Sequence, residues 1–206
     1  LAEIDRERLA ELCIGIVDIA SPTGRERPLA EWIAEQFTAV GIGGNVQALD
    51  DDQANAWAAI GAPGSAADLM LYAPIDTLTT GTAAGDVPWI GRTLPDHAVA
   101  RARRDGDQIT GLGAQNPKGH AACVFAAVEA IHRAGIELDG RLIAAFGAGG
   151  MPTNAIADDG PAGSEPTHGR RNTGQGVGAS FLLEQGVWAD AAVIAGLEPL
   201  VRAGAL

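Results

Sequence analysis

Three short apolar runs that alternate with helix-like segments constrain the fold of this chain more than any other feature. The runs span residues 68–73, 141–146 and 191–195, and each has the length and composition of a buried strand. Apolar residues recur at helical spacing in residues 5–20, 29–40, 118–134 and 177–185. This alternation predicts an α/β fold with a largely parallel core.

The remaining segments complete a prediction of one domain over residues 1–206. Two strands are expected at residues 45–49 and 56–60, joined by an acidic turn, and a turn at residues 105–107 leads into a short strand at residues 108–110. Residues 77–104 are rich in Gly, Pro and Thr, which predicts irregular structure. Residues 151–176 are expected to form a flexible loop insertion. Cys13 and Cys123 lie in apolar helical patterns, which predicts buried thiols.

Composition excludes several classes of function. The chain has 206 residues, of which 47% are hydrophobic, so it can bury a core. Its formal net charge of −12 argues against nucleic acid and anionic membranes as partners. No apolar run is long enough to span a bilayer, and no signal peptide is visible. These features and the cysteine usage predict a cytoplasmic protein.

Three motifs stand at the ends of predicted strands and at the start of a predicted helix. Pro74-Ile-Asp76 follows the first apolar run, Asn116-Pro-Lys118-Gly opens the helix, and a Gly-Gly pair follows the second run. In this order they resemble the family of zinc-dependent aminoacylases, acetylornithine deacetylases, succinyl-diaminopimelate desuccinylases and carboxypeptidase G-type enzymes, a metallopeptidase-like family. There the corresponding motifs are His-x-Asp, Asp-x-Lys-Gly and Glu-Glu. The resemblance implies that family's catalytic-domain fold, with a mixed, largely parallel sheet flanked by helices.

The same resemblance implies that the metal chemistry is lost. Pro74 stands where the family has a His ligand, Asn116 replaces the bridging Asp, and Gly149 and Gly150 replace the Glu pair. Proline and glycine side chains offer no ligand, and asparagine is a poor bridging anion for two zinc ions. Glu198, which precedes Pro199, matches a retained family ligand with a displacement of one residue. We therefore expect no metal cofactor.

The candidate site residues each have a structural alternative. The catalytic candidates are Asp76, Asn116 and Glu198. As a structural alternative, Asp76 would accept hydrogen bonds from loop amides and Asn116 would cap the helix that follows it. Glu198 would instead belong to a turn at the end of a strand. Asn116, Lys118 and His120 could bind a small carboxylate at the helix N-terminus, in a cleft widened by the lost side chains, or Lys118 and His120 could simply face solvent. The other histidines share no metal-ligand spacing: His97, His132 and His168.

Three functions remain open from the sequence. The leading one is a degenerate, metal-free subunit that scaffolds a larger hydrolase assembly or binds a small ligand within it. The second is a diverged hydrolase of amide or N-acyl amino acid bonds, with zinc, that uses Asp76, Asn116, His120 and Glu198 in a rearranged site completed by a partner chain. The third is a remnant with no present ligand.

The resemblance also predicts a partner. The chain ends at Leu206, about where the family inserts a dimerisation domain before a returning C-terminal segment completes the sheet. The absence of that return would leave an apolar sheet edge exposed, which a second chain must cover. The C-terminal half of the same ancestral protein is the first candidate for this second chain, and self-association is the second candidate.

Overall fold

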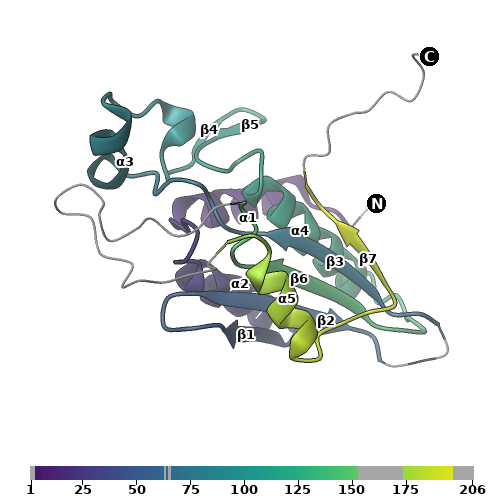
Figure 1. Ribbon diagram of the computed structural model, residues 1–206. Coiled ribbons are helices and arrows are strands. Elements are labelled where there is room, and N and C mark those ends of the chain that lie inside the picture. Colours follow the sequence, from purple (N-terminus) through teal and green to yellow (C-terminus); the bar gives the residue numbers. More distant parts are fainter. Residues whose placement is uncertain (1–2, 63, 65, 153–173, 197–206) are drawn as a thin grey trace, which may run out of the picture.

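The computed structural model describes residues 3–62, 64, 66–152 and 174–196, and its centre is a five-stranded sheet (Figure 1). The strand order is β1–β2–β6–β3–β7. β2 runs antiparallel to β1 and β6, whereas β3 runs parallel to β6 and β7. The predicted mixed α/β sheet is confirmed. The strand bounds are β1 (Gly44–Ala48), β2 (Ala54–Ile60), β3 (Leu69–Pro74), β6 (Leu142–Gly147) and β7 (Ala191–Ile194).

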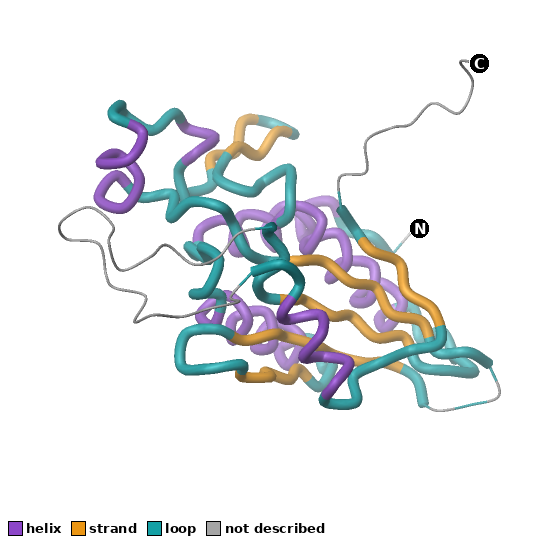
Figure 2. Tube along the Cα trace, viewed as in Figure 1, coloured by secondary structure: helices purple, strands orange, loops and turns teal. Residues whose placement is uncertain are grey.

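Helices cover both faces of this sheet. The helices α1 (Arg6–Asp18), α2 (Arg27–Ala39) and α4 (Lys118–Arg133) lie on one face, and α5 (Val177–Glu184) lies on the other (Figures 1 and 2). The larger core lies under the three helices, where the rings of Phe37 and Phe125 stack with centroids 3.9 Å apart and Phe146 of β6 packs beside them. These helices follow the predicted apolar stripes, because burying the stripe is what stabilises a helix on a sheet.

A helix interrupts the segment that we predicted to be irregular. The elements α3 (Ala83–Ile90), η1 (Asp96–Ala98), β4 (Arg103–Asp105) and β5 (Gln108–Thr110) lie together at one end of the molecule (Figure 1). The Thr82 hydroxyl caps α3 by accepting from the Gly85 N–H, and Gly91 ends the helix at φ +68°. The prediction of irregular structure was wrong at α3. Pro88 and the nearby glycines are typical of loops, and they outweighed the helix-capping residues in the sequence pattern.

Two predictions of burial were also wrong. Residues 191–195 were expected to form a buried strand, but all four residues of β7 are exposed, because β3 is its only neighbour among the described strands. Cys123 is exposed on α4, whereas Cys13 is buried as expected. In both cases the apolar pattern was real, but periodicity does not reveal which neighbour is present to cover it.

Two remaining expectations concern the loop and the membrane. Most of the expected loop at residues 151–176 lies outside the described residues. Among the helices that the structure describes, none has the length and apolar character needed to cross a membrane.

Candidate functional site

The segments that follow β3 and β6 meet because these two strands are parallel neighbours. Pro74 pairs in register with Gly147, so Asp76 and the Gly149-Gly150 pair emerge at the same end of the sheet. The carboxyl ends of parallel strands are where α/β proteins usually place ligands. The geometry at this point therefore decides whether the chain retains a site there.

Asp76 is fully buried, and both of its carboxylate oxygens accept hydrogen bonds. Oδ1 accepts from the Gly150 N–H at 2.7 Å. Oδ2 accepts from the Thr23 hydroxyl at 2.8 Å and from the Met151 N–H at 2.9 Å. The carboxylate thus joins the α1–α2 connection to the turn after β6, so its hydrogen bonds stabilise the fold at this point.

A second buried carboxyl group, Glu26, holds the same turn. Its Oε1 accepts from the N–H groups of Gly24 and Gly149, each at 2.9 Å, and from the Gln53 side chain at 3.3 Å. Its Oε2 is buried without a hydrogen-bond partner among the described residues. Burial and, to a smaller extent, the nearby charge of Asp76 together raise the pKa of Glu26 to about 7, although the hydrogen bonds from Gly24 and Gly149 act in the opposite direction. We did not predict this residue, since its only sequence signal is an acidic side chain just before α2.

Pro74 and Gly150 are packed directly against each other. A Cβ atom placed on Gly150 would lie 2.3 Å from the Cβ of Pro74 and 3.1 Å from Asp76 Oδ1. The proline ring therefore occupies the space that a side chain at position 150 would need. The expected widening of the cleft is wrong at this point, because the two substitutions fit each other.

Lys118 and Asn116 differ from the expected anion site. Lys118 is fully buried, and its Nζ donates to the Ile19 carbonyl at the end of α1. Burial lowers its pKa to about 8, although the charge of Asp18 acts in the opposite direction. Asn116 does not cap α4: the N-cap is Pro117, with no side-chain cap bond. The solvent-facing alternative for Lys118 is also wrong.

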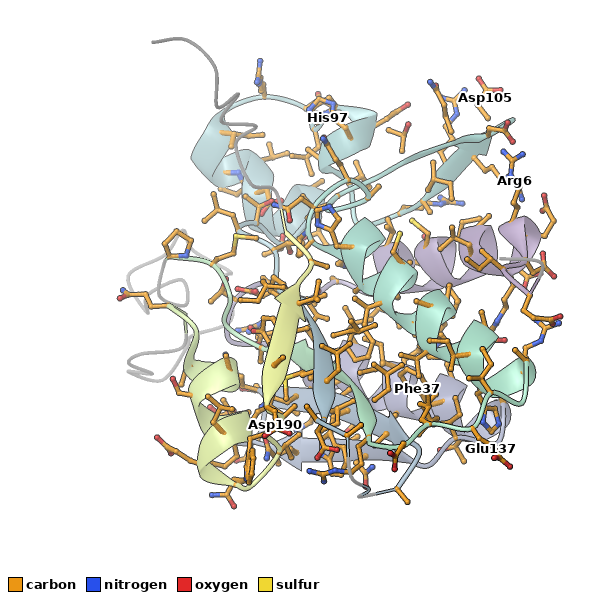
Figure 3. All side chains as sticks on the ribbon, turned by 90° about the vertical axis from the view of Figure 1, so that its right-hand side faces the viewer. Arg6, Phe37, His97, Asp105, Glu137 and Asp190 are labelled. Carbon is orange, nitrogen blue, oxygen red and sulfur yellow. The ribbon has the colours of Figure 1, made fainter. Side chains whose placement is uncertain are left out.

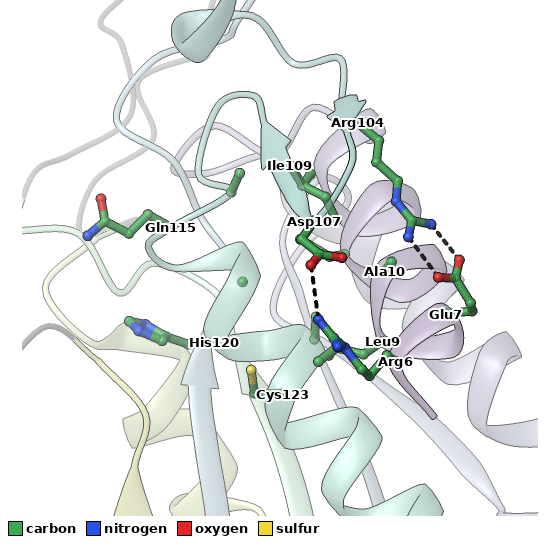
Figure 4. Close-up of a pocket in the computed structure, with 14 residues that line it drawn as sticks. Arg6, Glu7, Leu9, Ala10, Arg104, Asp107, Ile109, Gln115, His120 and Cys123 are labelled. Carbon is green, nitrogen blue, oxygen red and sulfur yellow. Dashed lines mark hydrogen bonds and ion pairs between the residues drawn. The ribbon is translucent and has the colours of Figure 1, made fainter. Parts of the chain in front are cut away.

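His120 instead lines a pocket of about 550 Å³ between α1, the β4–β5 hairpin and the start of α4 (Figure 4). The rim carries two ion pairs, Arg6 with Asp107 and Arg104 with Glu7. His120 Nδ1 is buried and lacks a hydrogen-bond partner in the described part of the chain. Lys118 and His120 therefore do not converge: the Lys118 amino group contacts the end of α1, whereas His120 lies among the residues that line this pocket.

A zinc pair does not fit the residues at the ends of β3 and β6. Pro74, Gly149 and Gly150 have no ligating side-chain atom, and the oxygens of Asp76 are occupied by the turn that they hold. Within the described ranges, no three His, Cys, Asp or Glu side chains gather closely enough to hold a metal ion. Glu198 and His168 lie outside those ranges, and His97 and His132 lie on η1 and at the end of α4.

Solved structures of peptidases share this fold. No protein-family model matches the sequence. An M20 family metallo-carboxypeptidase from Sulfolobus solfataricus superposes with a TM-score of 0.60 at 14% identity, over 92% of this chain and 37% of that one. LapB from Legionella pneumophila superposes with a TM-score of 0.56 at 14% identity, over 94% of this chain and 43% of LapB. A tripeptidase from Staphylococcus aureus superposes with a TM-score of 0.50 at 21% identity, over 71% of this chain and 37% of the tripeptidase.

These comparisons agree with the mixed α/β fold described above. The chain spans about two fifths of the length of these solved structures. The mixed sheet flanked by helices is thus a known architecture. The chain has the α/β fold of the M20 metallopeptidases.

Proposed function

We propose that this chain is a metal-free, non-catalytic peptidase-like domain that acts as a scaffold subunit by binding another polypeptide. One observation carries the proposal. The segments after β3 and β6, which meet where α/β proteins place their ligands, are fastened to each other by Asp76 and Glu26. Both carboxyl groups are used here to hold the turn that follows β6.

The chemistry of hydrolysis supports this reading. A catalytic zinc needs about three protein ligands aimed at one point, together with an open position for water. A general base must also reach that water. Glu26 has a pKa in the useful range, at about 7, but its side chain is fully buried and its Oε1 already accepts from backbone amides. It is therefore placed to support the fold and not to touch a substrate.

Metal content and hydrolysis of the purified full chain test the proposal. The protein is produced with zinc in the medium, purified without chelator and analysed for metal. It is then assayed with added Zn²⁺ or Co²⁺ on N-acetyl amino acids and on dipeptides. We expect far less than one metal ion per chain and no turnover above buffer. The Sulfolobus carboxypeptidase, treated identically, is the positive control.

The alternative, a diverged zinc hydrolase, makes the opposite prediction. Stoichiometric metal that only a chelator removes, with turnover lost at the same time, would establish that alternative and refute the scaffold. An Asp76→Asn variant separates a genuine activity from a contaminant. If the chain itself hydrolyses the substrate, turnover falls in this variant, whereas contaminating activity is unchanged.

A further inference from the structure

The pocket between α1, the β4–β5 hairpin and the start of α4 is separate from the ends of β3 and β6. Its volume of about 550 Å³ lies in the range of pockets that hold small molecules. Neither Asp76 nor the Gly149-Gly150 pair is among its lining residues. The side chains that line it come from α1, the hairpin and the start of α4 (Figure 4).

One face of α1 lines the pocket from its mouth to its floor. The four residues on this face are Arg6, Leu9, Ala10 and Cys13. They are spaced by three or four positions, so their side chains lie one above another along the helix. Arg6 is at the surface of the molecule (Figure 3), Leu9 and Ala10 are half-buried, and Cys13 is buried. The pocket thus runs from a charged mouth to an apolar floor.

Small side chains around the start of α4 leave this space open. Gly119 and Ala122 line the pocket from α4, and Ala114 lines it from the loop before that helix. Ile109 of β5 adds an apolar wall on the hairpin side. Protein cores are normally packed with few voids larger than a water molecule. An opening of this size with apolar walls therefore suits the apolar body of a ligand.

The two arginines at the mouth differ in how their donor groups are used. Arg104 donates to the Gly106 carbonyl and to both carboxylate oxygens of Glu7, the latter at 2.6 and 2.8 Å. Arg6 only approaches Asp107, at 3.3 Å, and the side chains of this pair are 81% and 83% exposed. An ion pair so exposed contributes little to stability, so it opens at little cost. Among the described residues, the Arg6 guanidinium group donates no hydrogen bond.

We propose that this pocket binds a small carboxylic acid with an apolar body. The ligand carboxylate accepts two parallel hydrogen bonds from the Arg6 guanidinium group, in place of the exposed contact with Asp107. The apolar body lies along Leu9 and Ala10 toward Cys13. Arg6 selects an acid because it stands on the same helix face as this apolar floor, whereas Asp107 lies across the mouth in the hairpin turn. An amide or an amine of the same shape cannot accept both bonds.

The ligand site is independent of the scaffold role, and the two proposals fail separately. Metal content and hydrolysis test the scaffold, whereas binding to this pocket requires neither metal nor turnover.

Calorimetric titration of the full chain with three probes of one shape tests the ligand class. The probes are phenylpropionate, its amide and phenylpropylamine. We expect the acid to bind at least about tenfold more tightly than the other two. Arg6→Met should remove this preference. The matched control is Arg103→Met, which changes the net charge equally and opens a similarly exposed pair with Asp96 outside this pocket, so it should keep the preference.

Filling the pocket tests where the acid binds. Ala10→Phe places a ring in the space assigned to the apolar body, so phenylpropionate binding should be lost. Ala39→Phe makes the same change at the exposed end of α2 and should leave binding intact. Circular dichroism confirms that each variant is folded, and Arg6→Met tests the site without a change in packing.

The exposed thiol of Cys123 reports on the same pocket, because it is one of the lining residues. Bound phenylpropionate should slow the alkylation of Cys123 by iodoacetamide, followed by mass spectrometry, and should have no effect in Ala10→Phe. Four results would each overturn the proposal: no binding of the acid at millimolar concentration, an amide or amine that binds as tightly, a preference that survives Arg6→Met, or binding that leaves Cys123 alkylation unchanged.

Discussion

At the scale of single residues, Glu26 makes stability depend on pH. Its pKa is about 7 in the folded chain and near 4.5 when unfolded, so the folded state binds the proton more tightly. Its contribution to stability is fully present below pH 4.5 and is lost as pH rises through 7. The shift corresponds to about 3 kcal/mol. We expect the unfolding free energy measured in urea to fall between pH 5 and pH 7.5.

The neutral variant Glu26→Gln identifies the source of that fall. Glutamine keeps an acceptor for the Gly24 and Gly149 amides but does not titrate. Its unfolding free energy should therefore change much less over the same pH range and exceed that of the wild type at pH 8. An equal fall in both proteins would show that other groups cause the dependence.

Substitution of Gly150, also at the residue scale, tests whether the Pro74 ring fills the space beside position 150. Gly150→Ala places a Cβ against Pro74, so we expect a loss of about 1–3 kcal/mol from overpacking. Gly43→Ala is the matched control, since a Cβ there meets nothing within 4 Å. Thermal and urea unfolding of both variants measure the difference. A cost at Gly150 no larger than at Gly43 would mean that the proline ring does not fill this space.

At the scale of elements, Lys118 connects the start of α4 to the end of α1. The fold lowers its pKa from 10.5 to about 8, so the folded state binds this proton less tightly than the unfolded state. Its contribution is present above pH 10.5 and is lost as pH falls through 8. The wild type should therefore gain stability relative to Lys118→Met as pH rises from 8 to 10. A constant difference between the two proteins would contradict the assigned pKa direction.

At the scale of the whole molecule, the two ends of interest in the sheet differ in how tightly they are held. The segments that follow β3 and β6 are held together by hydrogen bonds to Asp76 and Glu26 and by the contact between Pro74 and Gly150. Among the described residues, no strand pairs with the outer side of β7, and the side chains of β7 are exposed. Exposed apolar strands are common sites of contact between proteins, which agrees with the scaffold role proposed above.

The sequence by itself determined most of the helices and strands. Period-3.6 patterns located four of the helices, and apolar runs with turn residues located the five strands of the main sheet, because burying apolar side chains is the main source of their stability. The motifs at Pro74, Asn116 and Gly149 also indicated the fold through their resemblance to a known family, whereas the expected loss of metal binding stays a prediction.

Only the tertiary structure decided what each side chain faces. It buried Lys118 against Ile19, brought Glu26 to the turn after β6, and fitted Pro74 to Gly150, which lies 76 positions later in the chain. It also left the side chains of β7 exposed, where the pattern predicted a buried strand. Periodicity reports that a residue is apolar or that a helix begins, but burial, pKa and pairing depend on neighbours that are distant in sequence.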